Sequence, residues 1–463
     1  EVKENGMIDA PVENLHDLML QWESDCPSKP FGGAEEYSPS PDGTDIAIAC
    51  RRTEKGSNKQ PKDFSWSTCV SIYRMEIPES LHEKTNAEVI QDIDFFSWTM
   101  VSDVNNHAVA TSPVWSPDGR KLAYLTMSRP KYESDHCQIE VYDMESNSTT
   151  SVSPILLSNI SKNLDLSFSS LVWDYEEKNV SGGGIIAPKL ASAGDLPKAG
   201  VHSSMAEAAA SDVDRNDATV VEKDAALALL REVQSALAED VKQNVRSNSR
   251  EYILFATAQY RGSSRIFKLE VLEDISDSNM KVENVSVMIG DESRGTPMIV
   301  SATNSFTKKT EKMLYFTESS LTSPNILKSA KATGNGVFLP FTFDNNIHVG
   351  EVAVKYTDPC AAVREVFCPN PQYFNGDVTM PLVKQFYFAS KDENGMTLTD
   401  PKDLVHCWYM PPVIIQSSDD EANTAPSSVP LVLIIHGGPQ GAILNAWNYR
   451  WNLAYYSALG YGV

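Results

Sequence analysis

A short strand sequence recurs three times in this chain, and this repeat limits the folds that the chain can adopt. Lys121–Thr126 (KLAYLT) aligns with Tyr252–Thr257 (YILFAT) and with Lys312–Thr317 (KMLYFT). Repeated antiparallel hairpins at intervals of tens of residues are typical of β-propellers, whose blades each hold about four strands. A large β-sandwich is the alternative, but sandwiches lack a repeating turn-and-strand unit. Each copy is followed by a segment that we expect to be its partner strand: Ile139–Asp143, Arg265–Leu269 and Asn325–Lys328.

A Ser-Pro-Asp-Gly sequence precedes two of the predicted strands. Ser40–Gly43 precedes Asp45–Cys50, whose expected partner strand is Val70–Arg74, and Ser116–Gly119 precedes the first copy of the repeat. These residues suit a type I turn, because Pro presets φ at the second position and Gly is favoured at the fourth. The sequence therefore predicts a mainly β chain with a β-propeller over residues 36–375. Seven blades are expected, with the count left open.

The propeller pattern is interrupted between residues 182 and 249, in a stretch rich in Ala, Asp, Ser and Gly. Within it, residues 217–245 carry Leu and Val at spacings of three and four, which predicts a helix. We interpret the stretch as a surface insertion in a loop, since added loop length costs little entropy. The alternative is a helix that docks a partner. Residues 1–35 are assigned to an N-terminal segment, with packing against the C-terminal domain as one option.

From residue 376 to residue 463 the sequence changes in character and predicts the first strands of an α/β-hydrolase domain. A continuous apolar run is typical of a strand buried on both faces of a parallel α/β sheet. The predicted elements, in chain order, are a strand pair, such a buried strand, a helix and the start of another strand: Phe386–Ser390 with His406–Met410, Pro430–Ile435, Ala446–Leu459 and Gly460–Val463.

The predicted buried strand runs directly into the sequence His-Gly-Gly-Pro-Gln-Gly, which begins at His436. In α/β-hydrolases a His-Gly-Gly loop after the third strand supplies one backbone N–H of the oxyanion hole. Glycine is needed there because the backbone must approach the developing oxyanion closely. We therefore expect Gly438 to supply the N–H, with His436, Gly437 and Pro439 shaping the loop. An ordinary Gly-Gly-Pro turn is the alternative.

A propeller followed by this strand and loop resembles the prolyl oligopeptidase family of serine peptidases. The string HGGPQG, with Trp447–Asn452 and Gly460–Val463 after it, is similar to the dipeptidyl-peptidase V and acylaminoacyl-peptidase branch, as is Ser319–Pro324 in the propeller. The resemblance covers nearly the whole chain apart from 182–249. It implies a serine exopeptidase that cleaves short peptides through an acyl-enzyme without a cofactor, and a propeller that restricts access to the site.

In that family the catalytic Ser, in a G-x-S-x-G elbow, and then Asp and His follow this loop. No G-x-S-x-G occurs here and the first residue is Glu1, so we expect a piece of a longer protein with all three triad residues outside the chain. His436 is interpreted as a loop residue rather than the catalytic base, and Asp42 and Asp118 as turn residues. No residue is assigned to substrate binding. Four charged residues in candidate loops are interpreted as surface charges: Arg261, Arg265, Glu176 and Glu177.

Charge and cysteine content argue against several classes of function. With 39 Lys and Arg against 62 Asp and Glu, the formal net charge is −23, which disfavours nucleic-acid binding. No run approaches the ~18 apolar residues of a membrane helix. The seven cysteines show no CxxC spacing, so no metal is expected.

Short peptides are the expected partners, and a homo-oligomer is left open. The alternative function is a non-catalytic scaffold that binds a protein. Four N-x-S/T sequons lean towards secretion, with a cytoplasmic location left open: Asn147, Asn159, Asn179 and Asn284.

Overall fold

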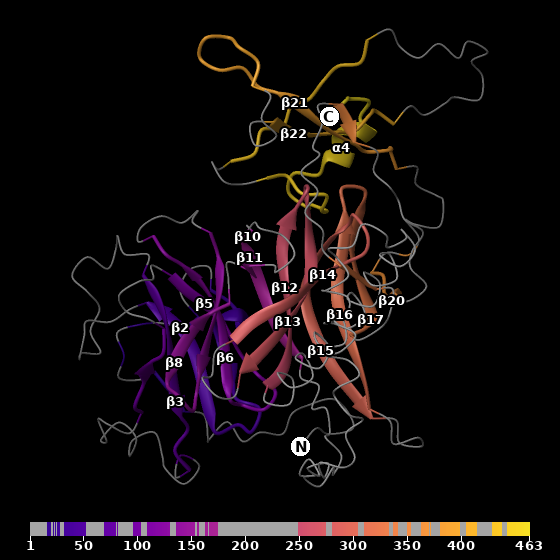
Figure 1. Cartoon of the computed structure of the whole chain (residues 1–463). Helices are drawn as coiled ribbons and strands as arrows, with labels where there is room; N and C mark the ends of the chain where they lie inside the picture. The colour runs from indigo at the N-terminus through magenta and orange to yellow at the C-terminus, as the bar shows by residue number, and fades with distance from the viewer. Residues whose placement is uncertain are drawn as a thin grey trace, which may run out of the picture. The chain divides into compact units, whose positions relative to one another are not determined.

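The computed structural model of the chain is mainly β (Figure 1). Most of the described residues belong to one compact unit, formed by Glu1–Tyr175, Glu251–Leu272 and Ser278–Val463. A second unit, Glu176–Arg250 with Glu273–Asp277, contains an ion pair between Arg250 and Glu273 at 3.6 Å. The structure describes residues 16–19, 22, 24, 26–27, 32–51, 69–79, 81, 96–102, 109–129, 136–152, 155–156, 163–164, 166–174, 249–274, 280–303, 310–332, 337–340, 350–352, 363–369, 371, 380–398, 404–413, 428–437 and 442–463.

Four units of four strands, blades 1 to 4, follow one another along the described chain. Blade 1 contains β1 (Tyr37–Pro39), β2 (Asp45–Arg51), β3 (Val70–Glu76) and β4 (Thr99–Met100), and blade 2 contains β5 (Val109–Trp115), β6 (Lys121–Met127), β7 (Gln138–Asp143) and β8 (Ser148–Ser151). One parallel pair, Val70 with Val109, joins these two blades. Blade 3 contains β11 (Phe168–Asp174), β12 (Ser249–Tyr260), β13 (Ser263–Asp274) and β14 (Met280–Met288), and blade 4 contains β15 (Ser293–Thr303), β16 (Thr310–Ser320), β17 (Ser323–Lys331) and β20 (Val363–Phe367).

The remaining described elements are short. β18 (Phe338–Pro340) adds to the edge of blade 3, and β9 (Ile155–Leu156) pairs with β10 (Asn163–Leu164). A third sheet has the order β19-β21-β22, in which β19 is Gly350–Val352, β21 is Lys384–Ala389 and β22 is Leu404–Tyr409. In the described ranges the helical elements are the 3₁₀ turn η2 (Ala34–Glu36) and the α-helix α4 (Leu453–Ala458).

The predicted repeat is confirmed as the second strand of a blade. The three copies lie in β6, β12 and β16, and their predicted partner strands lie in β7, β13 and β17, which are the third strands. The two strands predicted after the first Ser-Pro-Asp-Gly turn lie in β2 and β3, which are the second and third strands of blade 1. The chain is therefore a mainly β protein with a β-propeller, and the number of seven blades stays a prediction.

The two Ser-Pro-Asp-Gly turns fold alike. Gly43 N donates to Ser40 O at 3.0 Å, and Gly119 N donates to Ser116 O at 2.9 Å, each closing a four-residue turn. In both turns the Ser hydroxyl donates to the Asp carboxylate two residues later at 2.6 Å, and accepts from the first backbone N–H of the following strand at 2.9 Å. Both glycines have φ above +70°, which a residue with a Cβ rarely adopts. The aspartates Asp42 and Asp118 thus belong to the turns, as predicted.

The first strands of blades 2, 3 and 4 each contain a shift in register. In blade 3 the Ser169 hydroxyl shares a hydrogen bond of 2.8 Å with Thr257, and in blade 4 the Thr296 hydroxyl shares one of 3.2 Å with Thr317. Thr257 and Thr317 are the last residues of two copies of the repeat. The recurring Thr therefore has a structural role, because it binds the hydroxyl of a residue at the bulge on the neighbouring strand.

The cores lie between successive blades. One buried cluster joins blades 1 and 2, a second joins blades 2 and 3, and a third joins blades 3 and 4. Two tryptophan indoles reinforce this stacking, since Trp115 donates to Ser38 O at 2.9 Å and Trp173 donates to Val114 O at 3.0 Å. In each case the first strand of one blade binds the first strand of the blade before it.

The predicted helix over 217–245 lies outside the described residues, as does nearly all of the predicted insertion. The described part of the segment 1–35 contacts blade 1, where the Trp22 ring lies 4.8 Å from that of Tyr73. The domain limits at residues 35 and 375 stay predictions.

Candidate functional site

The apolar run that precedes the His-Gly-Gly loop pairs in parallel with the last residues of the chain. Leu431 is bridged to Gly462, Val432 N donates to Gly462 O at 2.8 Å, and Gly462 N donates to Pro430 O at 2.9 Å. On the other side of this segment, Met410 and Val463 exchange two backbone hydrogen bonds of 2.9 Å. Residues 460–463 thus lie between the end of β22 and the apolar run, which is the arrangement expected if they begin the next strand of the sheet.

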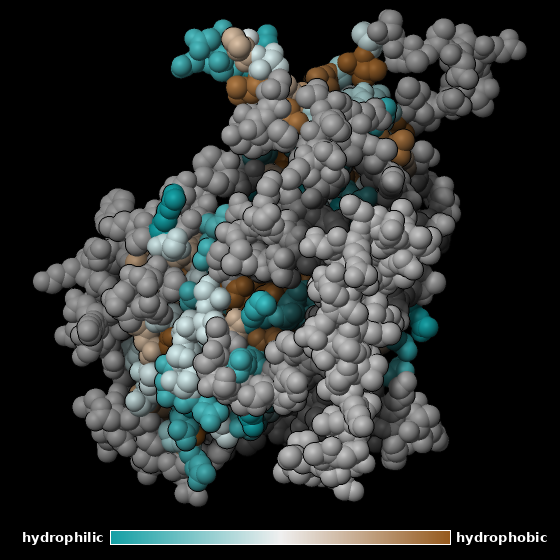
Figure 2. Space-filling view, in the orientation of Figure 1, coloured by the Kyte–Doolittle hydropathy of each residue, from teal (hydrophilic) through white to brown (hydrophobic). Residues whose placement is uncertain are grey.

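The prediction that this run is buried on both faces is wrong. Leu431, Leu433 and Ile435 are 68, 76 and 81% exposed, and they alternate along the backbone, so they share one face. In the described part of the chain the run has one bridged partner, Gly462, and no element covers this face. An apolar run is buried only where other elements pack on it. The space-filling view shows hydrophobic atoms on the surface near the C-terminal elements (Figure 2).

Of the four residues assigned to the loop, His436 and Gly437 are described, whereas Gly438 and Pro439 lie outside the described residues. The His436 imidazole is exposed, and its Nδ1 donates to Gly437 O at 2.7 Å. The ring is thus bound to the backbone of its own loop, which accords with a role in shaping it. The oxyanion role of Gly438 stays a prediction.

The helix predicted over Ala446–Leu459 is shorter than expected, since α4 begins at Leu453. Asn448 Oδ1 accepts from the backbone N–H of Arg450 and of Trp451 at 2.9 Å each, which closes a turn instead of a helix. Asn452 Oδ1 accepts from Ala454 N at 2.9 Å and caps the helix. Two asparagines therefore set the start of α4 by competing for backbone donors.

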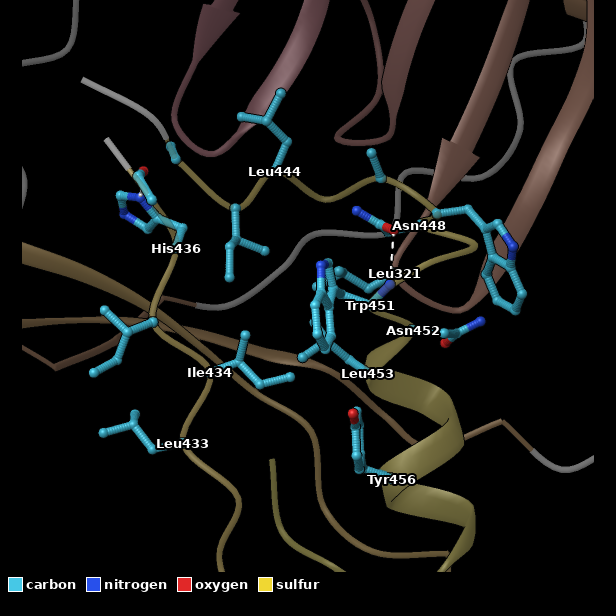
Figure 3. A pocket seen from close by; sticks show the side chains of 16 residues that line it. Leu321, Leu433, Ile434, His436, Leu444, Asn448, Trp451, Asn452, Leu453 and Tyr456 are labelled. Carbon is cyan, nitrogen blue, oxygen red and sulfur yellow. Dashed lines mark hydrogen bonds between the residues drawn. The ribbon is translucent and has the colours of Figure 1, made fainter. Parts of the chain in front are cut away.

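A pocket of about 630 Å³ lies between the apolar run, the segment that begins at Ala442, and α4 (Figure 3). His436 and Ile434 lie on one wall, with Leu453 and Tyr456 of α4 facing them. The described lining contains no Ser, Cys or charged side chain, so it offers an apolar surface with a few polar groups. The lining residues are Leu321, Leu433, Ile434, Ile435, His436, Gly437, Ala442, Ile443, Leu444, Ala446, Trp447, Asn448, Trp451, Asn452, Leu453 and Tyr456.

The β12–β13 turn, Arg261-Gly262, packs against β21 and β22. Gln385 Nε2 donates to Arg261 O at 2.9 Å and also lies 2.9 Å from His406 Nε2. Because the amide nitrogen is a donor, this His nitrogen is the acceptor and the ring is neutral. Burial lowers the pKa of His406, which favours the same neutral form. The Trp408 indole donates to Ile443 O at 2.8 Å and ties β22 to the pocket wall.

The charged residues considered for substrate binding take different places. Arg265 forms an ion pair with Asp291 at 2.6 Å, and its guanidinium lies 5.7 Å from the Tyr260 ring, so it is part of the blade structure rather than a simple surface charge. Arg261 has φ of +50° in the turn, with its guanidinium 5.5 Å from the same ring. Glu176 and Glu177 lie outside the described residues.

Three residues that bind one another or the Arg261-Gly262 turn were not predicted from the sequence: Gln385, His406 and Asn445. Each binds residues far away in the chain, such as Gln385 with Arg261 at a separation of 124 positions. No local motif marks such contacts. Among the residues that the structure describes, no group of three or more potential metal ligands occurs, and no helix is long and apolar enough to cross a membrane.

Blades followed by a parallel-paired strand and a His-Gly-Gly loop define a β-propeller joined to the first strands of an α/β-hydrolase domain. No family model matches the chain. It is 29% identical over 152 residues to dipeptidyl-peptidase 5 of Porphyromonas gingivalis, covering 33% of this chain and 19% of the relative. It is 30% identical over 178 residues to a probable dipeptidyl-peptidase 5 of Aspergillus clavatus, covering 38% of this chain and 21% of that relative. Over these partial matches the chain is similar to peptidases of the prolyl oligopeptidase family.

Both matches are partial, and the chain spans about a fifth of the length of these relatives. Among solved structures, a puromycin-hydrolyzing peptidase of Mycobacterium tuberculosis is similar over 92% of this chain and 50% of its own, at 12% identity and a TM-score of 0.36. So low a score adds nothing to the assignment of the fold.

Proposed function

We propose that the chain is the N-terminal portion of a serine exopeptidase that hydrolyses short peptides. The observation that carries the proposal is the parallel-paired strand that ends in His436 and Gly437 at the rim of an apolar pocket. This is where an α/β-hydrolase has its oxyanion loop. The similar proteins named dipeptidyl-peptidase 5 support a peptidase, and they favour release of dipeptides over removal of acylated residues.

In the proposed reaction a serine from outside this chain attacks the carbonyl carbon of the scissile peptide bond and gives its hydroxyl proton to the catalytic His. The carbonyl oxygen becomes an oxyanion, which accepts a hydrogen bond from the Gly438 N–H. The C–N bond then breaks, the amine leaves with a proton from the catalytic His, and an acyl-serine remains. Water hydrolyses this ester and regenerates the serine. The chain's contribution is thus one preorganised donor, which stabilises charge only as it develops.

The propeller is proposed to restrict entry to short peptides. Blades that stack through buried clusters form a continuous wall, and a folded protein would have to unfold to pass such a wall. The pocket lining carries no charge, so it would favour apolar groups next to the scissile bond.

The test uses the full-length protein with dipeptide anilides and with N-acyl-amino-acid anilides. Gly438→Ala should lower kcat by about 10²-fold or more while KM changes far less, because the lost donor acts in the transition state. His436→Ala is the control and should cost less, since that side chain only shapes the loop. Thermal midpoints of both variants separate a folding defect from a catalytic one.

Near-normal kcat for a folded Gly438→Ala variant would reject the oxyanion role and favour the ordinary turn. Failure of a fluorophosphonate to label the wild-type protein, with no turnover of either substrate, would reject the peptidase. In that case the non-catalytic scaffold becomes the better description.

A further inference from the structure

Asn445 is joined by four hydrogen bonds to the turns of two blades. Its backbone N–H donates to Gly262 O at 2.6 Å, and its backbone carbonyl accepts from Ser293 N at 3.2 Å. Its side-chain Oδ1 accepts from Leu321 N at 3.1 Å, and its Nδ2 donates to Asp291 O at 3.1 Å. These partners lie in the β12–β13 turn, the β14–β15 connection and the β16–β17 turn. Blades 3 and 4 therefore both hold this one residue.

The neighbours of Asn445 form one wall of the pocket. Leu444 and Ala446 line the cavity, whereas Asn445 is not among the lining residues. Leu444 is labelled beside the cavity in Figure 3. The side chain of Asn445 binds turns of the blades, so it can affect the cavity through the backbone on either side and through Leu321, a lining residue whose N–H it accepts. The described part of this wall begins at Ala442, four positions after Gly438, the predicted oxyanion donor.

The two side-chain bonds require an amide at this position. The side chain needs an acceptor for Leu321 N and a donor for Asp291 O at the same time, and Asn provides both on one carbon. A carboxylate would keep the acceptor and lose the donor. An alanine would lose both, leaving two polar backbone groups to find other partners.

We infer that Asn445 is a positioning residue, which anchors the pocket wall that follows the predicted oxyanion loop in the sequence on the turns of blades 3 and 4. The inference rests on the proposed peptidase function. A displacement of about 1 Å in a catalytic site can cost about 10²-fold in rate. Loss of this anchor should therefore reduce the rate of the chemical step, although Asn445 itself touches no substrate.

The experiment compares Asn445→Ala and Asn445→Asp with Asn325→Ala in the full-length protein. Asn325 is an exposed asparagine on β17 in blade 4, one of the two blades that hold Asn445, so its replacement controls for the loss of an amide side chain. Three quantities are measured: kcat and KM for a dipeptide anilide, the rate of labelling by a fluorophosphonate, and the thermal midpoint. The labelling rate matters because the phosphoryl oxygen needs the same oxyanion donors.

We expect Asn445→Ala to lower kcat and the labelling rate together by at least about 10-fold, with KM within about 3-fold of the wild-type value. Labelling should still reach completion, and the thermal midpoint should stay within a few degrees. Asn445→Asp keeps one of the two side-chain bonds and should show the same pattern; it serves as the test if the Ala variant does not fold. Asn325→Ala should match the wild type.

Normal kcat and labelling rate in the Asn445 variants would overturn the inference while leaving the proposed function intact. A loss that follows the thermal midpoint, with incomplete labelling, would overturn it too, because it would assign a purely structural role. A wild-type protein that neither turns over nor labels would instead reject the proposed function, and the positioning role with it.

Discussion

Replacing Gly262 by alanine should destabilise the contact between the β12–β13 turn and the sheet of β21 and β22. An added Cβ would lie 2.7 Å from His406 Cε1, 2.9 Å from Trp408 Cζ2 and 3.0 Å from Gln385 Nε2, all closer than carbon contacts normally are. The backbone φ of +79° adds about 1–2 kcal/mol for a residue with a Cβ. Overpacking adds about 1–3 kcal/mol, so the free energy of unfolding should fall by roughly 2–5 kcal/mol.

Gly395 provides a matched control, because it has the same φ of +79° and nothing within 4 Å of an added Cβ. Gly395→Ala should therefore cost only the backbone strain. Urea unfolding followed by tryptophan fluorescence should show Gly262→Ala to be the less stable variant by about 1–3 kcal/mol. His406→Ala in the Gly262→Ala background should recover part of this difference. Equal stabilities of the two glycine variants would refute the steric reasoning.

Three further predictions concern single side chains. Burial lowers the pKa of His406, so the unfolded state takes up the proton more readily than the folded state. The free energy of unfolding measured in urea should therefore fall as the pH drops below about 6.5. His406→Gln should reduce this fall. Burial raises the pKa of Asp143, but hydrogen bonds led by that from Lys121 outweigh this and hold the pKa below its usual value, so stability should fall as pH drops below about 4. Lys121→Met should cost about 3 kcal/mol in the same assay at neutral pH. Ser116→Ala removes two hydrogen bonds and should lower the free energy of unfolding by about 1–2 kcal/mol, with a similar loss for Ser40→Ala; no loss in either would contradict the turn role.

The blades could be predicted from the sequence because their strands obey local rules. A Ser-Pro-Asp-Gly turn fixes where a strand begins, and the strand after it carries apolar residues that meet the neighbouring blade. The reason for the recurring Thr could not be predicted, since its partner hydroxyl lies on another strand. For Thr257 that partner is Ser169, at a separation of 88 positions.

The site was harder to predict because its parts come together only in the fold. Asn445 reaches Leu321 and Asp291 across 124 and 154 positions, and no local pattern announces such contacts. For the apolar run at Leu433, by contrast, the sequence predicted burial that the structure does not show. Its composition predicts burial, because removing apolar surface from water is favourable, but burial also needs an element on the other side.

The pairing of Met410 with Val463 has a consequence for synthesis. These residues exchange two hydrogen bonds across 53 positions, so the edge of β22 lacks this neighbour until the later segment has been made. At roughly 5–20 residues per second the delay is roughly 3–10 s. An unpaired strand edge is a template for association with other chains. Newly made copies should therefore be most prone to aggregate in this interval, and a chaperone that binds extended apolar strands would act then.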